Sequence, residues 1–423
     1  MKTLRYLSVC IMLSLISSFV SIQALPPQNG FRGAFRNGIF NEKGLLDEWP
    51  AEGPVELWSI DDAGKGYSSP TVAENMVFVT GLNEVGDKEK LSAYTLDGKK
   101  RWAVEYGEPW SKNYTHARCC PTIANGRAYV VSGNCDVACI NVATGTIEWS
   151  VRVGKVYQTR QAPFGTSEAP IVYDNKVIVT PVGEKATMVA LDALTGKEIW
   201  TTPPIDDAKC SFTSPALIEH KGKVQIVAVV FFDLLGIDIK TGIIMWRTNE
   251  WLTEDVTRDI ALCNSPIYEN GSLFFSDGYD GGGWKYSLDE SSSSAKQIWK
   301  NKEFDVHHGG YVLVNETLYG SNWTTNTGGN WMAVDWNTGK TLYETPWEGR
   351  GKGCIISAGN HLIAYEERRG TVALVRPSRE KFDIVSQFRI TKGDGPHWAH
   401  PIVHKGIMYI RHGEALMAFN IKK

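Results

Sequence analysis

One motif recurs along most of this 423-residue chain and constrains its fold more than any other feature. The clearest copy runs from Ala190 to Trp200 and contains Asp-x-x-Thr-Gly-x-x-x-Trp. The aromatic residues that close the successive copies lie 44 to 53 residues apart, at Trp58, Trp102, Trp149, Trp200, Trp246, Trp299, Tyr343 and Phe388. This period is typical of β-propeller blades, which repeat about every 40–50 residues. We expect each closing aromatic to cover the turn of an adjacent blade.

A second repeat has the same count. Each unit also contains a tight turn between two short apolar runs, at residues 74–75, 125–126, 174–175, 221–222, 270–271, 315–316, 359–360 and 405–406. Such turns connect antiparallel strands, so we assign them to the hairpin between the first two strands of each blade. The Thr-Gly turns then join the third strand to the fourth. The two repeats together predict an all-β fold, an eight-bladed β-propeller with four-stranded antiparallel blades.

The last unit indicates how the ring closes. Residues 400–420 supply three strands and leave no length for a fourth. Residues 55–59 have the character of a fourth strand but have no blade in front of them. Pairing this N-terminal strand with the C-terminal blade would complete the eighth blade and remove both exposed sheet edges. We therefore expect a propeller over residues 55–423, preceded by an arm, residues 25–54, that extends over one face.

The first 24 residues read as a signal peptide. Lys2 and Arg5 precede an apolar stretch over residues 7–20, and Ala24 suits the cleavage point. This predicts a soluble mature protein in the periplasm or outside the cell. The formal net charge of the whole chain is −3, and no run of basic residues is present, so we expect no nucleic-acid partner. Nothing in the sequence requires an oligomer, and a monomer is expected.

The motif Asp-x-x-Thr-Gly-x-x-x-Trp, repeated through eight units, resembles the pyrroloquinoline-quinone (PQQ)-like repeat superfamily in its exported bacterial members. The resemblance covers residues 55–421. That superfamily includes quinoprotein alcohol dehydrogenases and the propeller lipoprotein of the outer-membrane barrel-assembly machinery. Fold does not fix function, so the resemblance is compatible with an enzyme and with a scaffold.

For an enzyme, the resemblance implies PQQ on the propeller axis, with Ca²⁺ beside it, a stacked Trp, an Asp base and a disulfide between adjacent cysteines. Cys119 and Cys120 are such an adjacent pair. They are either a vicinal disulfide, two ordinary thiols, or partners of Cys135 or Cys139. No motif of this chain matches the calcium ligands or the base, and the spacing of its Cys and acidic residues predicts no metal site.

The segments that lead into the first strand of each blade should form one mouth of the central funnel. They carry groups suited to binding a ligand: Tyr67, Arg118, Cys119, Cys120, Asn264, Lys352, His397 and Trp398. They also carry groups suited to proton transfer: Glu168, His307, His308 and His400. Convergent polar groups of this kind predict a small-molecule site, although a water-filled channel would also be lined with polar residues.

Three functions remain open at this level. The first is an oxidoreductase of the quinoprotein alcohol dehydrogenase type that acts in the funnel. The second is a non-catalytic scaffold that binds partner proteins of the cell envelope. The third is a module that binds a glycan or another small molecule without turnover. The chemically varied funnel favours a small-molecule site over a pure scaffold.

Overall fold

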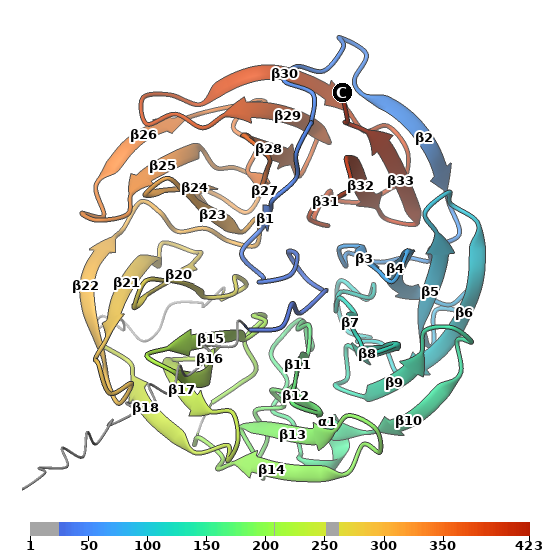
Figure 1. Cartoon of the computed structure of the whole chain (residues 1–423), viewed down its shortest axis with the longest axis vertical. Helices are drawn as coiled ribbons and strands as arrows, with labels where there is room; N and C mark the ends of the chain where they lie inside the picture. The colour runs from blue at the N-terminus through green and yellow to red at the C-terminus, as the bar shows by residue number, and fades with distance from the viewer. Residues whose placement is uncertain (1–24, 207, 251–261) are drawn as a thin grey trace, which may run out of the picture.

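The computed structural model describes residues 25–206, 208–250 and 262–423, and it shows an eight-bladed β-propeller (Figure 1). The predicted fold class is confirmed. The predicted signal peptide, residues 1–24, lies outside the described residues. The described part contains no helix with the length and hydropathy of a membrane span.

Blades one to four follow one another around the ring, each with its first strand innermost. Blade one contains β3 (Thr71–Ala73), β4 (Met76–Leu82), β5 (Glu89–Thr95) and β6 (Lys100–Gly107), and blade two contains β7 (Thr122–Ala124), β8 (Arg127–Val131), β9 (Val137–Asn141) and β10 (Ile147–Val151). After the short helix α1 (Val153–Val156), blade three contains β11 (Ile171–Tyr173), β12 (Lys176–Val179), β13 (Met188–Asp192) and β14 (Glu198–Thr202). Blade four contains β15 (Ala216–His220), β16 (Lys223–Val230), β17 (Asp233–Asp238) and β18 (Ile244–Thr248).

Blades five to eight complete the ring. Blade five contains β19 (Ile267–Glu269), β20 (Ser272–Asp277), β21 (Gly282–Leu288) and β22 (Ala295–Asn301), and blade six contains β23 (Tyr311–Val314), β24 (Thr317–Ser321), β25 (Trp331–Asp335) and β26 (Thr341–Thr345). Blade seven contains β27 (Gly353–Ala358), β28 (His361–Glu366), β29 (Thr371–Arg376) and β30 (Asp383–Arg389), with β1 (Ile39–Phe40) added beside β27. Blade eight contains β31 (Ile402–His404), β32 (Ile407–His412) and β33 (Ala415–Asn420), with β2 (Val55–Ile60) as its outer strand.

The ring closes as predicted, because the N-terminal strand β2 completes the C-terminal blade. β2 pairs antiparallel with β33, from Val55 opposite Asn420 to Ile60 opposite Leu416. The hairpin prediction is also confirmed. Asn125 and Gly126, for example, have φ of 51° and 72°, the left-handed conformation that suits a two-residue hairpin turn.

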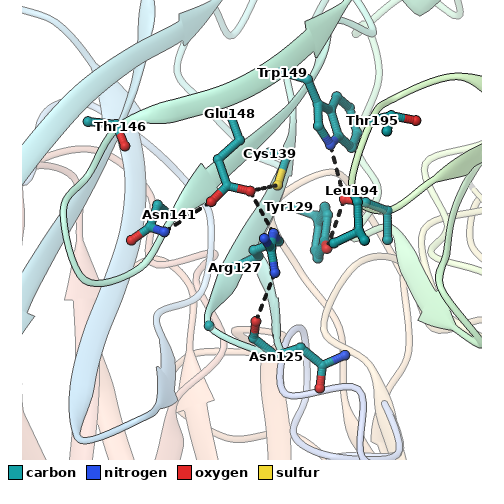
Figure 2. A network of polar contacts seen from close by, with 12 residues as sticks. Asn125, Arg127, Tyr129, Cys139, Asn141, Thr146, Glu148, Trp149, Leu194 and Thr195 are labelled. Carbon is teal, nitrogen blue, oxygen red and sulfur yellow. Dashed lines mark hydrogen bonds and ion pairs between the residues drawn. The ribbon is translucent and has the colours of Figure 1, made fainter.

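Five of the closing tryptophans connect their blade to the next one. The Trp149 indole nitrogen donates to the Ala193 carbonyl at 3.0 Å, in the turn between β13 and β14 (Figure 2). A Cβ atom at Gly196 in that turn would lie 2.8 Å from the Trp149 ring, so the ring packs directly on the backbone. Equivalent indole-to-turn hydrogen bonds come from Trp58, Trp102, Trp200 and Trp299. Trp246 differs: the turn of the following blade lacks Thr-Gly, and Trp246 donates to Gln225 of its own blade instead.

Gly242→Ala is expected to destabilise the propeller by about 2–4 kcal/mol, because it combines backbone strain with overpacking. Gly242 has φ of 74°, and a Cβ there would lie 2.4 Å from the Trp200 ring. The matched control is Gly222→Ala, at φ of 78° with nothing within 4 Å of the new Cβ. The control should lose only the backbone contribution, about 1–2 kcal/mol. Urea unfolding of both variants measures the difference, and equal losses would contradict the packing role of Trp200.

The N-terminal arm does more than lie over one face, which corrects the expectation. Its first part enters the centre of the ring (Figure 1). Gln28 exchanges hydrogen bonds with the backbone of Val172 in β11, at 3.0 and 3.1 Å. β1 then runs parallel to β27, with Ile39 opposite Ser357. The sequence pattern missed this because the arm belongs to no repeat.

Candidate functional site

One cavity of about 350 Å³ lies where the segments that lead into the innermost strands meet. Every blade contributes to its lining, through Tyr67, Arg118, Glu168, Phe212, Cys263, His307, Lys352 and Trp398. We call this space the axial cavity. Its position confirms that the predicted entry segments converge.

The N-terminal arm supplies the floor of the axial cavity. Phe31 lines the cavity, and its ring meets His400 edge-on at 5.1 Å. The neighbouring Arg32 is buried and donates to His400 Nδ1 at 2.7 Å and to the Ile355 carbonyl at 3.1 Å. Arg36 is buried too, and it donates to backbone carbonyls of blades three and four. The arm therefore closes the propeller axis beneath the cavity.

Aromatic side chains form much of the wall. Trp398 is central: its ring centroid lies 4.9 Å from that of Tyr67, 5.3 Å from that of Tyr114 and 5.0 Å from that of His308. Phe164 extends this surface towards Phe212, with ring centroids 5.6 Å apart. Of the twenty lining residues, seven are Phe, Tyr or Trp, which suits a flat or apolar ligand.

A buried ion pair lies in the wall beside these rings. Lys352 bonds to Glu367 and donates to the Asn326 carbonyl at 2.8 Å. The second carboxylate oxygen of Glu367 lies 3.1 Å from Nε2 of His308. Glu367 follows β28, outside the entry segments, and sequence reasoning did not find it. Burial raises the pKa of Glu367, while Lys352 opposes that rise.

Three imidazoles line the cavity and are kept neutral by burial. Burial, with the nearby Lys352, lowers the pKa of His307 to about 3. Burial likewise lowers the pKa of His308 well below its usual value. His400 has a pKa lowered to about 3 by burial and by Arg32. Because Arg32 can only donate to its Nδ1, the proton of His400 sits on Nε2, which donates to the His308 carbonyl at 2.9 Å.

Arg118 differs from Lys352 because it has no carboxylate partner within the described part of the chain. It donates to the Tyr114 carbonyl, and its Nε is buried without a hydrogen-bond partner. Among the ion pairs of the described residues, none involves Arg118. Burial lowers its pKa from the usual value. An arginine without a carboxylate partner in an aromatic wall can form charge-assisted hydrogen bonds with an anionic ligand.

Glu168 is the single carboxylate among the described residues that line the axial cavity. Its Oε1 accepts the Thr180 N–H at 2.8 Å. Burial raises the pKa of Glu168 to about 7, so the group exchanges its proton near neutral pH. This value suits the proton-transfer role predicted for it.

Three predicted site residues lie outside the cavity lining. Cys119 is buried, and its thiol donates to the Thr166 carbonyl. Asn264 uses its amide to hold the turn at 306–310, donating to the Val306 and His307 carbonyls and accepting from Gly310. His397 bonds to Tyr365 and stacks on His412 with ring centroids 3.6 Å apart.

Cys120 lines the cavity, and its pKa is raised to about 11 by burial. The structure has Cys119 and Cys120 as free thiols, together with the other five cysteines of the described residues. Cys119 and Cys120 are therefore ordinary thiols in this structure, and neither forms a disulfide with the other or with Cys135 or Cys139. Burial also raises the pKa of Cys119 well above its usual value, so neither thiol is an activated nucleophile.

A family profile described as outer membrane protein assembly factor BamB matches residues 87–345, more than half of the chain. The chain belongs to this family of PQQ-like propellers. A search of curated proteins finds no match. Among solved structures, BamB from Moraxella catarrhalis has a TM-score of 0.62 at 13% identity, covering 87% of this chain and 99% of its own.

Quinoprotein enzymes are similar to the same extent. Quinohemoprotein alcohol dehydrogenase from Comamonas testosteroni has a TM-score of 0.66 at 12% identity, covering 94% of this chain and 80% of its own. A europium-containing methanol dehydrogenase has a TM-score of 0.58 at 12% identity and covers 85% of each chain. At these identities the likeness shows the shared fold alone.

These relatives make PQQ and its metal ion the cofactors to test against the cavity. PQQ is flat, which suits the aromatic wall, and it is anionic, which suits the Arg118 guanidinium. A metal ion beside it does not fit: the described residues contain no group of three His, Cys, Asp or Glu side chains that could hold one. Glu168 has no second lining carboxylate among these residues. PQQ is thus a candidate ligand by shape and charge, and the residues that line the cavity do not favour calcium-assisted oxidation.

Proposed function

We propose that this protein is exported to the periplasm or beyond the cell, and that it binds a flat anionic small molecule in the axial cavity. The observation that carries the proposal is Arg118, a cation in an aromatic wall that has no carboxylate partner among the residues that the structure describes. The floor that the N-terminal arm supplies also supports this proposal, because a cavity closed at one end shields a bound ligand from water.

The two cations of the wall have different tasks in this proposal. Lys352 is already neutralised by Glu367, so an anionic ligand gains little there. Arg118 is free to form a charge-assisted hydrogen bond with a carboxylate, and such bonds contribute about 1.5–3 kcal/mol. Trp398, Tyr67 and Tyr114 supply the stacking surface. PQQ is one flat anionic molecule of this kind, and when bound it would act as a two-electron acceptor.

Arg118→Gln is expected to weaken PQQ binding by about 10–100-fold, from the loss of that charge-assisted bond. Isothermal titration of the purified mature protein, with and without calcium, measures the affinity. The control is Arg376→Gln, an exposed arginine paired with Asp383 in blade seven, which should leave binding unchanged. Equal affinity in wild type and Arg118→Gln would remove Arg118 from the site.

A scaffold is the second candidate, favoured by the match to a family described as an outer membrane protein assembly factor. In that function the propeller binds partner proteins of the cell envelope, and the axial cavity needs no ligand. The same titration separates the two. No heat of binding at high micromolar PQQ or with other aromatic carboxylates would favour the scaffold.

A further inference from the structure

An exposed turn borders the axial cavity on the side of blade six, and the proposed function gives it no role. Trp323 begins this turn between β24 and β25, and its side chain is partly exposed. The next four residues are all exposed, namely Thr324, Thr325, Asn326 and Thr327. Asn326 also lines the axial cavity, so the turn lies at the edge of that space. We call residues 323–327 the rim turn.

A buried carboxylate holds the rim turn in place. Asp305 is 3% exposed, and its Oδ1 accepts the Trp323 N–H at 3.1 Å. Its Oδ2 accepts the Asp280 N–H at 3.1 Å. Asp280 lies in the turn between β20 and β21 of blade five, next to Tyr279, which lines the cavity. One side chain therefore fastens the neighbouring turns of two blades to each other, and this fixes the position of the rim turn.

A row of aromatic rings connects the rim turn to Arg118. The row begins at Tyr114, whose carbonyl accepts a hydrogen bond from Arg118. Successive ring centroids along the row lie 4.5–5.3 Å apart. In order, the rings are Tyr114, Trp398, His308, His307, Tyr279 and Trp323. The first five line the axial cavity, so the row continues from the cavity wall to its edge.

The two ends of this row face different parts of a ligand. Arg118 enters from blade two and Trp323 from blade six, on opposite sides of an eight-bladed ring. A flat molecule with its carboxylate at Arg118 would therefore present the end remote from that carboxylate to the rim turn. Asp280 is exposed beside this end, and its carboxylate would repel an anion there. The remote end of the ligand should be neutral.

The rim turn has the chemistry that a neutral, hydroxyl-rich group requires. The Trp323 indole nitrogen donates to Asn326 Oδ1 at 3.3 Å, which orients both side chains. The Asn326 backbone carbonyl accepts from Lys352 at 2.8 Å, while its amide NH₂ group has no partner among the described residues. The three threonine hydroxyls of the turn can each donate and accept, as sugar hydroxyls also do. A flat indole offers an apolar face on which the C–H groups of a sugar ring can pack.

We propose that the rim turn is a sugar-binding subsite, and that the ligand of the axial cavity is a glycoside of an aromatic acid. The inference rests on the proposed function, which places the carboxylate at Arg118 and the flat ring in the cavity. The sugar is joined to the remote end of that ring, packs on Trp323 and exchanges hydrogen bonds with Asn326. Binding is reversible, and no covalent bond forms or breaks.

Two ligands that differ only in the sugar test this inference, namely p-methoxycinnamate and the phenolic O-glucoside of p-coumarate. Both have the same flat ring and carboxylate, and glucose replaces the methyl group in the second. Isothermal titration at pH 8 compares their affinities, because burial raises the pKa of Asp305 to about 7 and its carboxylate is then ionised. We expect the wild type to bind the glucoside about 10-fold more tightly, from one ring contact and one or two hydrogen bonds.

Variants of the rim turn assign the preference to its residues. Trp323→Ala should bring the two affinities within about twofold, whereas Trp323→Phe should keep most of the preference. In Asp305→Asn the amide oxygen can accept only one of the two N–H groups, so the preference should fall to about threefold with unchanged p-methoxycinnamate affinity. Asn337→Ala, an exposed asparagine of the β25–β26 turn outside the cavity lining, is the control and should keep the preference. Circular dichroism checks that each variant is folded.

The outcomes separate this inference from the proposed function. Equal wild-type affinity for the two ligands overturns the sugar subsite and leaves the proposed function intact, because p-methoxycinnamate reports only on Arg118 and the aromatic wall. A preference that persists in Trp323→Ala also overturns the subsite. If neither ligand binds while PQQ does, the ligand class is wrong, and if PQQ also fails to bind, the proposed function itself is overturned.

Discussion

Arg36→Ala should lower the free energy of unfolding by about 3–5 kcal/mol, one of the two largest effects expected in this protein. Arg36 is 2% exposed and donates to three carbonyls, those of Ala169 at 2.7 Å, Pro170 at 2.6 Å and Pro215 at 2.9 Å. Removing the guanidinium leaves these buried acceptors without a hydrogen bond, and each unsatisfied acceptor costs about 1–3 kcal/mol of stability. Water that enters the space recovers part of this cost. Urea unfolding followed by tryptophan fluorescence measures the loss.

Two further variants make the Arg36 result specific. Arg36→Lys keeps the charge but replaces a rigid fork by a single ammonium group, so it should recover only part of the stability. Arg376→Ala removes a surface arginine with 61% side-chain exposure, and this variant should lower the free energy of unfolding by less than about 1 kcal/mol. A loss below 1 kcal/mol for Arg36→Ala would show that the arm is not fastened to the axis through this residue.

The repeats predicted the propeller because each blade encodes its own turns and its own connection to the next. The Thr-Gly turns, the hairpin turns and the closing Trp residues are local patterns, and each has a local structural cause. The arm has no such pattern. Arg32 and Arg36 bind carbonyls that lie more than a hundred residues away, and only the folded ring brings those acceptors together.

The predicted entry segments meet at the axial cavity, but the sequence did not show which of two neighbouring residues faces it. Cys120, Cys263 and Trp398 line the cavity, whereas the adjacent Cys119, Asn264 and His397 do not. In each of these three pairs one side chain faces the cavity and its neighbour does not, whereas the adjacent His307 and His308 both line it. Without the register of each segment, the sequence could not say which one.

Other wall residues lay outside the segments that the sequence analysis considered. Tyr114 and Phe164 belong to long connections between an outer strand and the next inner strand, and the length of these connections was a usable signal. Glu367 follows a second strand, and its importance depends on the pairing with Lys352 that only the fold creates. Phe31 enters from the arm.

Between pH 5 and pH 8 the free energy of unfolding of the wild type should fall by about 2–3 kcal/mol more than that of Glu89→Gln. Burial raises the pKa of Glu89 to about 7 in the folded protein, above the usual value of 4.5. The folded state therefore binds this proton more tightly than the unfolded chain. Its contribution is fully present below pH 4.5 and is lost as the pH rises through about 7. Urea unfolding at both pH values measures the double difference, in which other titrating groups cancel.

Glutamine suits this site because it can keep the local hydrogen bonds. Glu89 accepts the Gly133 N–H at 2.8 Å and the Tyr106 hydroxyl at 2.6 Å. The amide oxygen can still accept from Gly133, and the amide N–H₂ can donate to the Tyr106 oxygen, whose hydrogen then turns to the Val131 carbonyl, 3.4 Å away. The variant thus removes the titration with little change in packing.

Tyr106→Phe should change the pH dependence in the opposite direction. The Tyr106 hydroxyl bond lowers the pKa of Glu89 against the effect of burial, so its loss moves that pKa further upward. The stability of this variant should then fall more steeply than that of wild type between pH 5 and pH 8, while that of Glu89→Gln falls less steeply. Opposite changes in the two variants would identify Glu89 as the titrating group. Parallel changes would assign the pH dependence to other buried groups, among them Glu168 and Asp305, whose pKa values burial also raises to about 7.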